Sequence, residues 1–445
     1  MVSMDLERIS STIENAHTIK RTGRVTHVIG LVIEALGPTA SVGELCYIVN
    51  DSDEKVAAEV VGFKDKKVLL MALGQMSGVN PGSVVHATGH AFMVPVGRSL
   101  LGRVINGLGQ PIDGKGPLFQ EAECPVNNLP INPLERGRIH EPMQTGIKVI
   151  DSMVTCGRGQ RMGIFSGSGV GKSVLMGMIA QNASAPVNVI ALIGERGREV
   201  MEFLDKDLGK EGLKKSVVVV ATSDQPALVR IKGAYCATAI AEYFRDQGLD
   251  VILMMDSITR FAMAQREVGL SVGEPPTTKG YTPSVFNLLP KLLERSGKNL
   301  YGSITALYNV LVESDDMNEP VSDAVRSILD GHIVLSRELA EQGHYPAVDV
   351  LNSISRVMID IVPKGHLDAA IRFKDIISTY RRAQDLINIG AYVKGTNPKI
   401  DEAIDCIDDI NAFFRQGIGE FVDYDISVAT LQKLAKQPKR DDKQD

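Results

Sequence analysis

The chain has 445 residues, 44% of them hydrophobic and 23% charged, which is ordinary for a folded soluble protein of about two to four domains. Its formal net charge of −6 gives no electrostatic reason to expect a nucleic-acid partner, because such affinity comes mainly from clustered Lys and Arg. The five cysteines are far apart and no apolar run reaches ~18 residues, so the composition indicates no disulfide framework, zinc site or membrane span.

The first 92 residues divide into a helical stretch and a β-rich stretch. Residues 1–20 carry a narrow apolar stripe at helical spacing, formed by Leu6, Ile9, Ile13 and Ala16. Such a helix packs on its own domain or docks another protein, and the stripe leaves both interpretations open. Residues 21–92 contain six short β-type runs separated by turn residues, which predicts a small barrel or sandwich. The runs are Val25–Ile29, Leu31–Glu34, Cys46–Val49, Ala57–Val61, Lys67–Met71 and Val84–Thr88.

The remainder is predicted to contain a connecting segment, an α/β domain and a helical domain. Residues 93–146 are rich in Gly, Pro and Asn and are interpreted as the connecting segment. Between residues 147 and 365, nearly continuous apolar runs alternate with helical stretches, which is typical of a parallel sheet in an α/β fold. Residues 366–435 are predicted to be helical, and the polar residues 436–445 to be disordered.

A phosphate-binding loop is predicted after the apolar run Met162–Phe165, at the start of a helix. The sequence Ser-Gly-Ser-Gly-Val-Gly-Lys-Ser matches a Walker A loop, except that Ser166 replaces the usual first glycine. Such a loop points backbone N–H groups at phosphate oxygens, and the helix N-terminus adds a favourable partial positive charge. Lys172 is expected to reach the β- and γ-phosphates of ATP, and the Ser173 hydroxyl to bind Mg²⁺. The predicted ATP-binding residues here are Gly167, Ser168, Gly169, Val170, Gly171, Lys172, Ser173 and Val174.

Three acidic residues are candidates for the chemistry of ATP hydrolysis. Asp256 ends the buried run Val251–Met255, where a Walker B carboxylate holds Mg²⁺. Glu195 directly follows the run Val187–Ile193 and is the candidate that orients and polarises the attacking water. Glu199, four residues later, is a candidate for the outer Mg²⁺ shell. The alternative for Glu195 and Glu199 is a surface loop of mixed charge.

Two arginines are candidates for stabilising the charge that develops on the γ-phosphate, which must be met by cations. Arg260 lies four residues after Asp256 and is therefore expected to face the same pocket. Arg356 follows a strand-like run and, considered alone, is an ordinary surface arginine.

Together these motifs resemble the catalytic subunits of rotary ATPases, and most closely the ATPases of type III protein export. The resemblance covers roughly residues 20 to 430, nearly the whole chain. The matching stretches are Gly157–Arg161, Ile193–Glu199, Asp256–Arg260 and His344–Asp349. The stretches that favour the export branch are Gly273–Tyr281, Pro283–Phe286 with Leu292–Arg295, and Asp315–Pro320 with Leu329–Arg337.

The resemblance implies a RecA-like P-loop ATPase core with a parallel sheet, preceded by a small N-terminal β-barrel and followed by an α-helical C-terminal domain. It also implies a homohexamer in which each ATP lies between two subunits, with Arg356 of the neighbour acting as the arginine finger. Tyr345 would stack on the adenine, and Phe414–Ile418 would close the other side of the base.

The resemblance further implies several partners. These are a stator-like regulator at the N-terminal helix, a coiled-coil stalk, export chaperones and their substrates, and a membrane export gate. We therefore expect a cytoplasmic protein, peripheral at the inner face of the cell membrane through the export apparatus. The expected function is ATP hydrolysis that releases and unfolds chaperone-bound flagellar substrates for the gate.

Three other functions are alternatives to flagellar export. An injectisome secretion ATPase and the catalytic subunit of a rotary H⁺-coupled ATPase share the phosphate-site residues, but the latter needs a separate non-catalytic partner subunit. A hexameric RNA translocase is disfavoured, because residues 23–91 contain only Tyr47 and Phe63 as aromatic residues for stacking on RNA.

Overall fold

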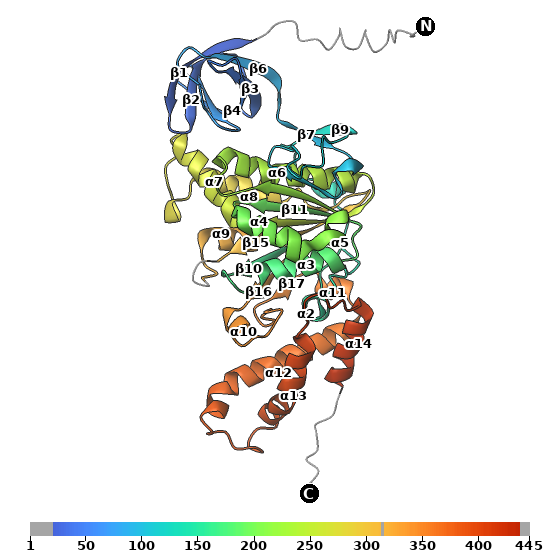
Figure 1. Cartoon of the computed structure of the whole chain (residues 1–445). Coiled ribbons are helices and arrows are strands. Elements are labelled where there is room, and N and C mark those ends of the chain that lie inside the picture. The colour runs from blue at the N-terminus through green and yellow to red at the C-terminus, as the bar shows by residue number, and fades with distance from the viewer. Residues whose placement is uncertain (1–20, 313–315, 437–445) are drawn as a thin grey trace, which may run out of the picture. The chain divides into compact units, whose positions relative to one another are not determined.

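The computed structural model describes residues 21–312 and 316–436 (Figure 1). These residues fall into two compact units, of which the first contains the β-rich residues 21–92 and the second contains most of the remaining chain. The predicted N-terminal helix, residues 1–20, lies outside the described residues, as does the predicted disordered tail apart from Lys436. No helix within the described ranges is long and apolar enough to cross a membrane.

The first unit is a closed barrel of antiparallel strands in the order β1, β2, β5, β4, β3, β6. Because alternate residues of a strand face opposite sides, side chains such as Ile33, Ile48 and Leu70 are fully buried in the barrel core. The predicted small barrel or sandwich is therefore a barrel. Its strands are β1 (Thr22–Ile29), β2 (Val32–Leu36), β3 (Glu44–Val49), β4 (Lys55–Lys64), β5 (Lys67–Ala72) and β6 (Val84–Ala91).

Within the described residues, the second unit contains a nine-stranded sheet in the order β17, β16, β10, β15, β13, β11, β12, β8, with β14 paired to β15 off this path. The strands are parallel except for β14 and β17, which confirms the predicted parallel sheet. The strands are β8 (Arg103–Asn106), β10 (Arg161–Ser166), β11 (Val187–Ile193), β12 (Ser216–Ala221), β13 (Asp250–Asp256), β14 (Gly297–Lys298), β15 (Ser303–Leu311), β16 (Gly331–Leu335) and β17 (Ile354–Ser355).

The edge strand β8 corrects the interpretation of residues 93–146 as only a connecting segment. β8 pairs in parallel with β12, so this segment supplies one strand of the main sheet. The segment also contains β7 (Met93–Val96) and β9 (Ala122–Pro125), which form a separate antiparallel pair. Strands of four residues are too short to show a clear apolar pattern, so they resemble loops in the sequence.

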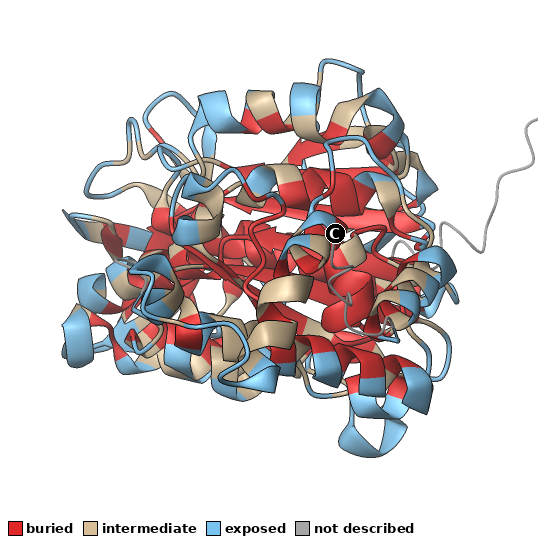
Figure 2. Ribbon diagram, turned by 90° about the horizontal axis from the view of Figure 1, so that it is seen from below, coloured by how far each residue is buried: buried red, intermediate tan, exposed pale blue. Residues whose placement is uncertain are grey.

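Helices cover both faces of the main sheet, and buried residues gather along the strands and the inner faces of the helices (Figures 1 and 2). Leu175 and Ile179 of α3 share a hydrophobic core with strand residues, and α6 packs against β11, β12 and β13 from the other side. The helices of this region are α2 (Lys148–Met153), α3 (Lys172–Asn182), α4 (Gly197–Glu202), α5 (Gly209–Lys214), α6 (Ala227–Asp246), α7 (Ile258–Ser271), α8 (Pro283–Leu293), α9 (Pro320–Ile328), α10 (Arg337–Glu341) and α11 (Met358–Ile361), with a π-helical turn at Phe203–Leu208.

The C-terminal region is helical, as predicted, and shares the hydrophobic core of the sheet region. Phe373 lies edge-on to both Phe413 and Phe414, with ring centroids 6.3 Å apart in each pair. His366 is fully buried, and its Nε2 lies 2.7 Å from the carbonyl oxygen of Ser152 in α2. The helices are therefore joined to the sheet region by packing as well as by the chain, and they are α12 (Lys364–Asn388), α13 (Pro398–Phe414) and α14 (Tyr424–Ala435).

Candidate functional site

The predicted phosphate-binding loop lies where β10 ends and α3 begins. The loop comprises residues 167–171, between Ser166 and Lys172. Gly169 and Gly171 have φ values of +80° and +86°, in the left-handed region that residues with a Cβ rarely adopt. The chain thus turns tightly into the N-terminus of an 11-residue helix, which is a favourable place for an anion.

Lys172 contacts Asp256, as expected if the two belong to one site. Lys172 Nζ lies 2.6 Å from Asp256 Oδ1, although the two residues are 84 positions apart in the sequence. Asp256 ends β13 and is only 4% exposed. A buried carboxylate is costly unless it is paired, so the ammonium group stabilises its charge.

Glu195 and Glu199 form a second acidic group beside Asp256. Burial, the negative charge of Asp256 and a hydrogen bond with Glu199 raise the pKa of Glu195 from 4.5 to about 8. The same hydrogen bond lowers the pKa of Glu199 below its ordinary value. Glu195 therefore has the near-neutral pKa that suits a general base, while Glu199 stays ionised.

Arg260 lies in the first turn of α7 and packs against Gly194, the residue before Glu195. A Cβ on Gly194 would lie 2.8 Å from the Cβ of Arg260, so a glycine is needed for this close approach. The Nε of Arg260 is buried and has no hydrogen-bond partner among the described residues. A guanidinium with an unused N–H group is suited to an anionic ligand.

A largely apolar cavity of about 370 Å³ adjoins the phosphate-binding loop. The ring of Tyr345 forms part of its wall and is close to the loop, because a Cβ on Gly171 would lie 3.3 Å from a ring carbon. An apolar cavity of this size beside a phosphate site is suited to a planar base. Its walls also include Val174, Met178, Leu335, Ala347, Gln416 and Ile418.

Gln416 fastens one wall of this cavity to the rest of the site. Its backbone N–H donates to the carbonyl oxygen of Tyr345 at 3.0 Å. Its side-chain Nε2 donates to the carbonyl oxygens of Gly146 and Glu420, and its Oε1 accepts from the Lys148 N–H, all within 2.8 Å. The sequence indicated only the range Phe414–Ile418, because Gly146 and Lys148, two of the partners of Gln416, lie about 270 residues away.

Phe414 does not line the cavity and corrects part of that range. It is 4% exposed and packs against Phe373 in the core of the helical region. An apolar residue near a predicted ligand is therefore not sufficient to place it in the wall, since the end of a helix also needs apolar residues for packing.

The structure places Arg356 away from the phosphate-binding loop of its own chain. Ser355 pairs with Gly331 of β16, and Gly331 pairs with Met162 near the start of β10. The loop begins after Ser166, four residues further along β10, which corresponds to roughly 13 Å of strand. Arg356 is exposed and therefore accessible to another molecule.

Three family models match the chain. The ATP synthase alpha/beta family, nucleotide-binding domain, matches residues 146–355, and the beta-barrel domain of the same family matches residues 25–89. The C-terminal domain of the type III secretion ATPase EscN matches residues 362–433. Each match falls on a part of the chain that has the corresponding structure.

Characterised relatives match over nearly the full length. The flagellum-specific ATP synthase of Bacillus subtilis is 56% identical, with 97% of this chain and 99% of that protein covered. The type 3 secretion system ATPase of Xanthomonas euvesicatoria is 48% identical, with coverage of 93% and 94%. A solved structure of the assembled ATPase EscN from enteropathogenic E. coli, in complex with its central stalk EscO, is 46% identical, with a TM-score of 0.86 and coverage of 93% and 100%.

Proposed function

The chain belongs to the ATP synthase alpha/beta family, in its branch of type III export ATPases, and from this membership we propose that it hydrolyses ATP to drive flagellar protein export. The observation that carries the proposal is the contact of Lys172 with Asp256 at a glycine-rich loop, with Glu195 beside it. Together they supply a phosphate-binding cation, a carboxylate for Mg²⁺ and a base, which are the groups that phosphoryl transfer to water requires.

The donor set around the loop suits Mg²⁺ that arrives with the nucleotide. No group of three or more His, Cys, Asp or Glu side chains among the described residues could hold a metal ion by itself. Mg²⁺ is usually bound by one or two carboxylates together with substrate phosphates, so Asp256, Ser173 and Glu199 are sufficient partners. When bound, the ion would neutralise charge on the β- and γ-phosphate oxygens.

The remaining site residues divide the chemical work. Lys172 binds the β- and γ-phosphates, and Arg260 adds a second cation near the same oxygens. Glu195 orients the attacking water and accepts its proton, which requires that Glu195 itself is ionised at that moment. Tyr345 stacks on the adenine, while Val174 and Ile418 cover the rest of the base.

Turnover is proposed to need a second copy of the chain, because Arg356 cannot reach the loop of its own chain. In a homohexamer, Arg356 of one subunit would complete the site of the next. The solved relative EscN is described as assembled and bound to a central stalk, which supports a ring and a coiled-coil stalk partner here. The chain would then act in the cytoplasm, peripheral at the membrane through the export apparatus. Its further partners would be a stator-like regulator, export chaperones, their substrates and the export gate.

The flagellar branch is favoured over the injectisome branch by sequence identity. The chain shares 56% of residues with a flagellum-specific ATP synthase, and 48% with a type 3 secretion system ATPase. Both branches use the same phosphate site, so the difference bears on the exported substrates and not on the chemistry.

The proposal is tested by replacing Lys172 with Ala. The purified variant should lose Mg²⁺-dependent ATP turnover, and cells that carry it should release no flagellar proteins into the medium. Lys210→Ala, at an exposed lysine of α5, is the matched control and should change neither. Normal flagellar secretion by the Lys172 variant, with loss of another secreted set, would instead identify an injectisome ATPase. Turnover that appears only after a different subunit is added would identify a rotary H⁺-coupled enzyme.

A further inference from the structure

Arg356 combines an accessible side chain with a firmly held backbone. Its exposed guanidinium contacts the carbonyl oxygen of Arg326 at 3.4 Å, which is a long hydrogen bond. Its backbone N–H donates to the carbonyl oxygen of Asp330 at 3.0 Å. The strand that precedes it, β17, has only two residues, and a pairing this short does little to fix the chain by itself. Other contacts must therefore place the backbone of Arg356.

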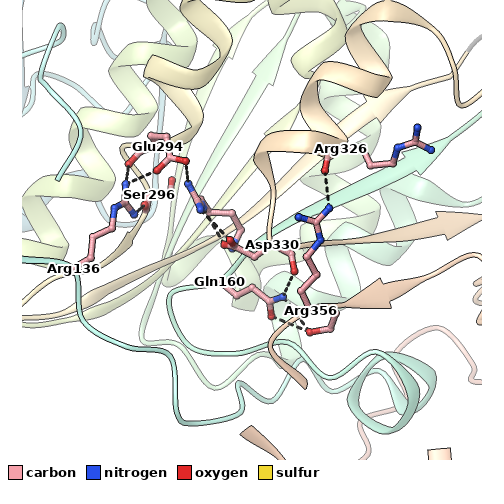
Figure 3. A network of polar contacts seen from close by, with 9 residues as sticks. Arg136, Gln160, Glu294, Ser296, Arg326, Asp330 and Arg356 are labelled. Atoms are coloured by element: carbon pink, nitrogen blue, oxygen red, sulfur yellow. Dashed lines mark hydrogen bonds and ion pairs between the residues drawn. The ribbon is translucent and has the colours of Figure 1, made fainter. Parts of the chain in front are cut away.

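The side-chain amide of Gln160 supplies these contacts (Figure 3). Gln160 is fully buried, and its Nε2 lies 3.1 Å from both the carbonyl oxygen of Asp330 and the hydroxyl of Ser355. Its Oε1 accepts from the Gly157 N–H at 2.8 Å and lies 3.3 Å from the same Ser355 hydroxyl. Gln160 thus contacts Ser355, the residue before Arg356. The carbonyl oxygen of Asp330 accepts hydrogen bonds from both the Gln160 side chain and the Arg356 backbone N–H.

Ion pairs fix the position of Asp330, whose carbonyl oxygen binds both Gln160 and Arg356. Arg161 makes a bidentate contact with the carboxylate of Asp330, with both N–O distances 2.9 Å. Arg161 also pairs with Glu294 at 2.5 Å. Glu294 in turn accepts a hydrogen bond from Arg136 at 2.7 Å (Figure 3). The carbonyl oxygen of Asp330 is therefore fixed relative to the start of β10.

Gly331 allows β17 to lie close to β16 and to the start of β10. A Cβ on Gly331 would lie 2.5 Å from the carbonyl oxygen of Ile354 and 2.7 Å from the sulfur of Met162. These distances are too short for any side chain, so the approach of β17 to β16 and β10 depends on glycine at this position.

We propose that Gln160 is a positioning residue for Arg356, setting the place from which this arginine enters the neighbouring subunit's nucleotide site. The inference rests on the proposed function, because it requires that Arg356 acts between subunits. Gln160 makes no contact with the phosphate-binding loop of its own chain, since it lies at the opposite end of β10. Its loss should therefore impair hydrolysis while leaving nucleotide binding by the same chain unchanged.

The first test compares Gln160→Ala with a matched control, Asn188→Ala. Asn188 is also a fully buried amide in the same sheet, and its Nδ2 likewise donates to a carbonyl oxygen, of Ala180, and to a serine hydroxyl, of Ser216. Gln160→Ala should lower kcat by roughly 10- to 100-fold, because a displacement of about 1 Å costs that much in a positioned group. Affinity for a fluorescent ATP analogue should stay within about twofold. Asn188→Ala should lower the melting temperature with little effect on kcat.

The second test asks whether the defect acts on the neighbouring subunit. Chains with Lys172→Ala have no working loop but carry an intact Arg356, so mixing them with Arg356→Ala chains should restore turnover. Mixing them with Gln160→Ala chains should restore turnover in the same way. In the double variant, Gln160→Ala should cost nothing beyond Arg356→Ala, because residues that act as one unit are not additive. Ser355→Ala, a milder change, should show the same pattern with a several-fold loss, and replaces Gln160→Ala if that variant does not fold.

The outcomes separate the two levels of the argument. If Arg356→Ala keeps full turnover, Arg356 does not act at the neighbouring subunit's site, and the positioning role of Gln160 is then wrong as well. If Arg356→Ala is restored by mixing but Gln160→Ala and Ser355→Ala are not, only the positioning role is wrong. Equal loss of kcat in Asn188→Ala would also overturn it, because the effect would then reflect general loss of packing.

Discussion

Replacing Glu199 by Gln should shift the pH dependence of ATP hydrolysis, because Glu199 helps to keep a proton on Glu195. The pKa of Glu195 is raised to about 8, so its proton-accepting form appears only as the pH rises. The ionised fraction grows from about 0.09 at pH 7 to about 0.9 at pH 9, so kcat/KM should rise about tenfold over this interval.

The size of the shift follows from the contact that is removed. An ionised Glu199 accepts a hydrogen bond from protonated Glu195, whereas a glutamine amide donates one to the ionised form. A hydrogen bond to a charged group is worth roughly 1.5 kcal/mol in a partly exposed setting, which corresponds to about one pKa unit. Burial and the charge of Asp256 remain, so the midpoint should fall toward pH 7 and stay well above the ordinary value of 4.5.

The assay is steady-state ATP turnover from pH 6.5 to 9.5 at constant ionic strength and excess Mg²⁺, because kcat/KM reports the pKa values of the free enzyme. Glu202→Gln is the matched control, since Glu202 lies on the same helix and pairs with Arg198 at 3.0 Å. Its midpoint should equal that of the wild type. A midpoint in Glu199→Gln that stays near 8 or rises would refute the account, as would an equal shift in the control.

Three further predictions concern the metal, the cavity wall and the choice of base. Asp256→Asn should lower turnover by roughly 10²- to 10³-fold and raise the Mg²⁺ concentration needed for half-maximal rate. The variant weakens the binding of Mg²⁺ and leaves Lys172 without its anionic partner, and a magnesium titration of the rate checks both effects. Gln416→Ala removes the side-chain hydrogen-bond partner of one buried and two partly buried backbone groups, so it should raise KM for ATP and destabilise the fold by about 1–3 kcal/mol. Nucleotide titration and urea unfolding measure the two effects, and unchanged KM with lost stability would mean that Gln416 does not set the wall. GTP should be hydrolysed within about tenfold of the ATP rate, because the side chains around Tyr345 are largely apolar and the Gln416 amide already binds backbone groups. A much stronger preference for ATP in competition between the two nucleotides would contradict this prediction.

The parts of the site that could be predicted from the sequence are those written in a few consecutive residues. The glycines before Lys172, and Asp256 and Glu195 at the ends of apolar runs, each combine a chemical group with a local structure that the surrounding residues determine. Parallel strands end at the same edge of a sheet, so these groups converge without any knowledge of the full strand order. Their catalytic roles remain predictions that the experiments above address.

The parts that could not be predicted depend on contacts between distant segments. Gln416 reaches residues about 270 positions away, and Gln160 lies 195 positions from Ser355. β8 was missed because its four residues have meaning only beside β12, at the far edge of the sheet. In each case the hydrogen-bond partner is selected by the tertiary fold and leaves no pattern in the nearby sequence.

The C-terminal end of α13 leads directly into the wall of the apolar cavity, so a movement of this wall would tilt the helix. α13 ends at Phe414, two residues before Gln416, and its 17 residues span roughly 26 Å, with α12 packed against it. A tilt of about 5° at the end nearest the cavity would move the far end of α13 by roughly 2 Å over that length. A small displacement of the cavity wall would therefore become larger along α13 and would be largest at the N-terminal end of that helix.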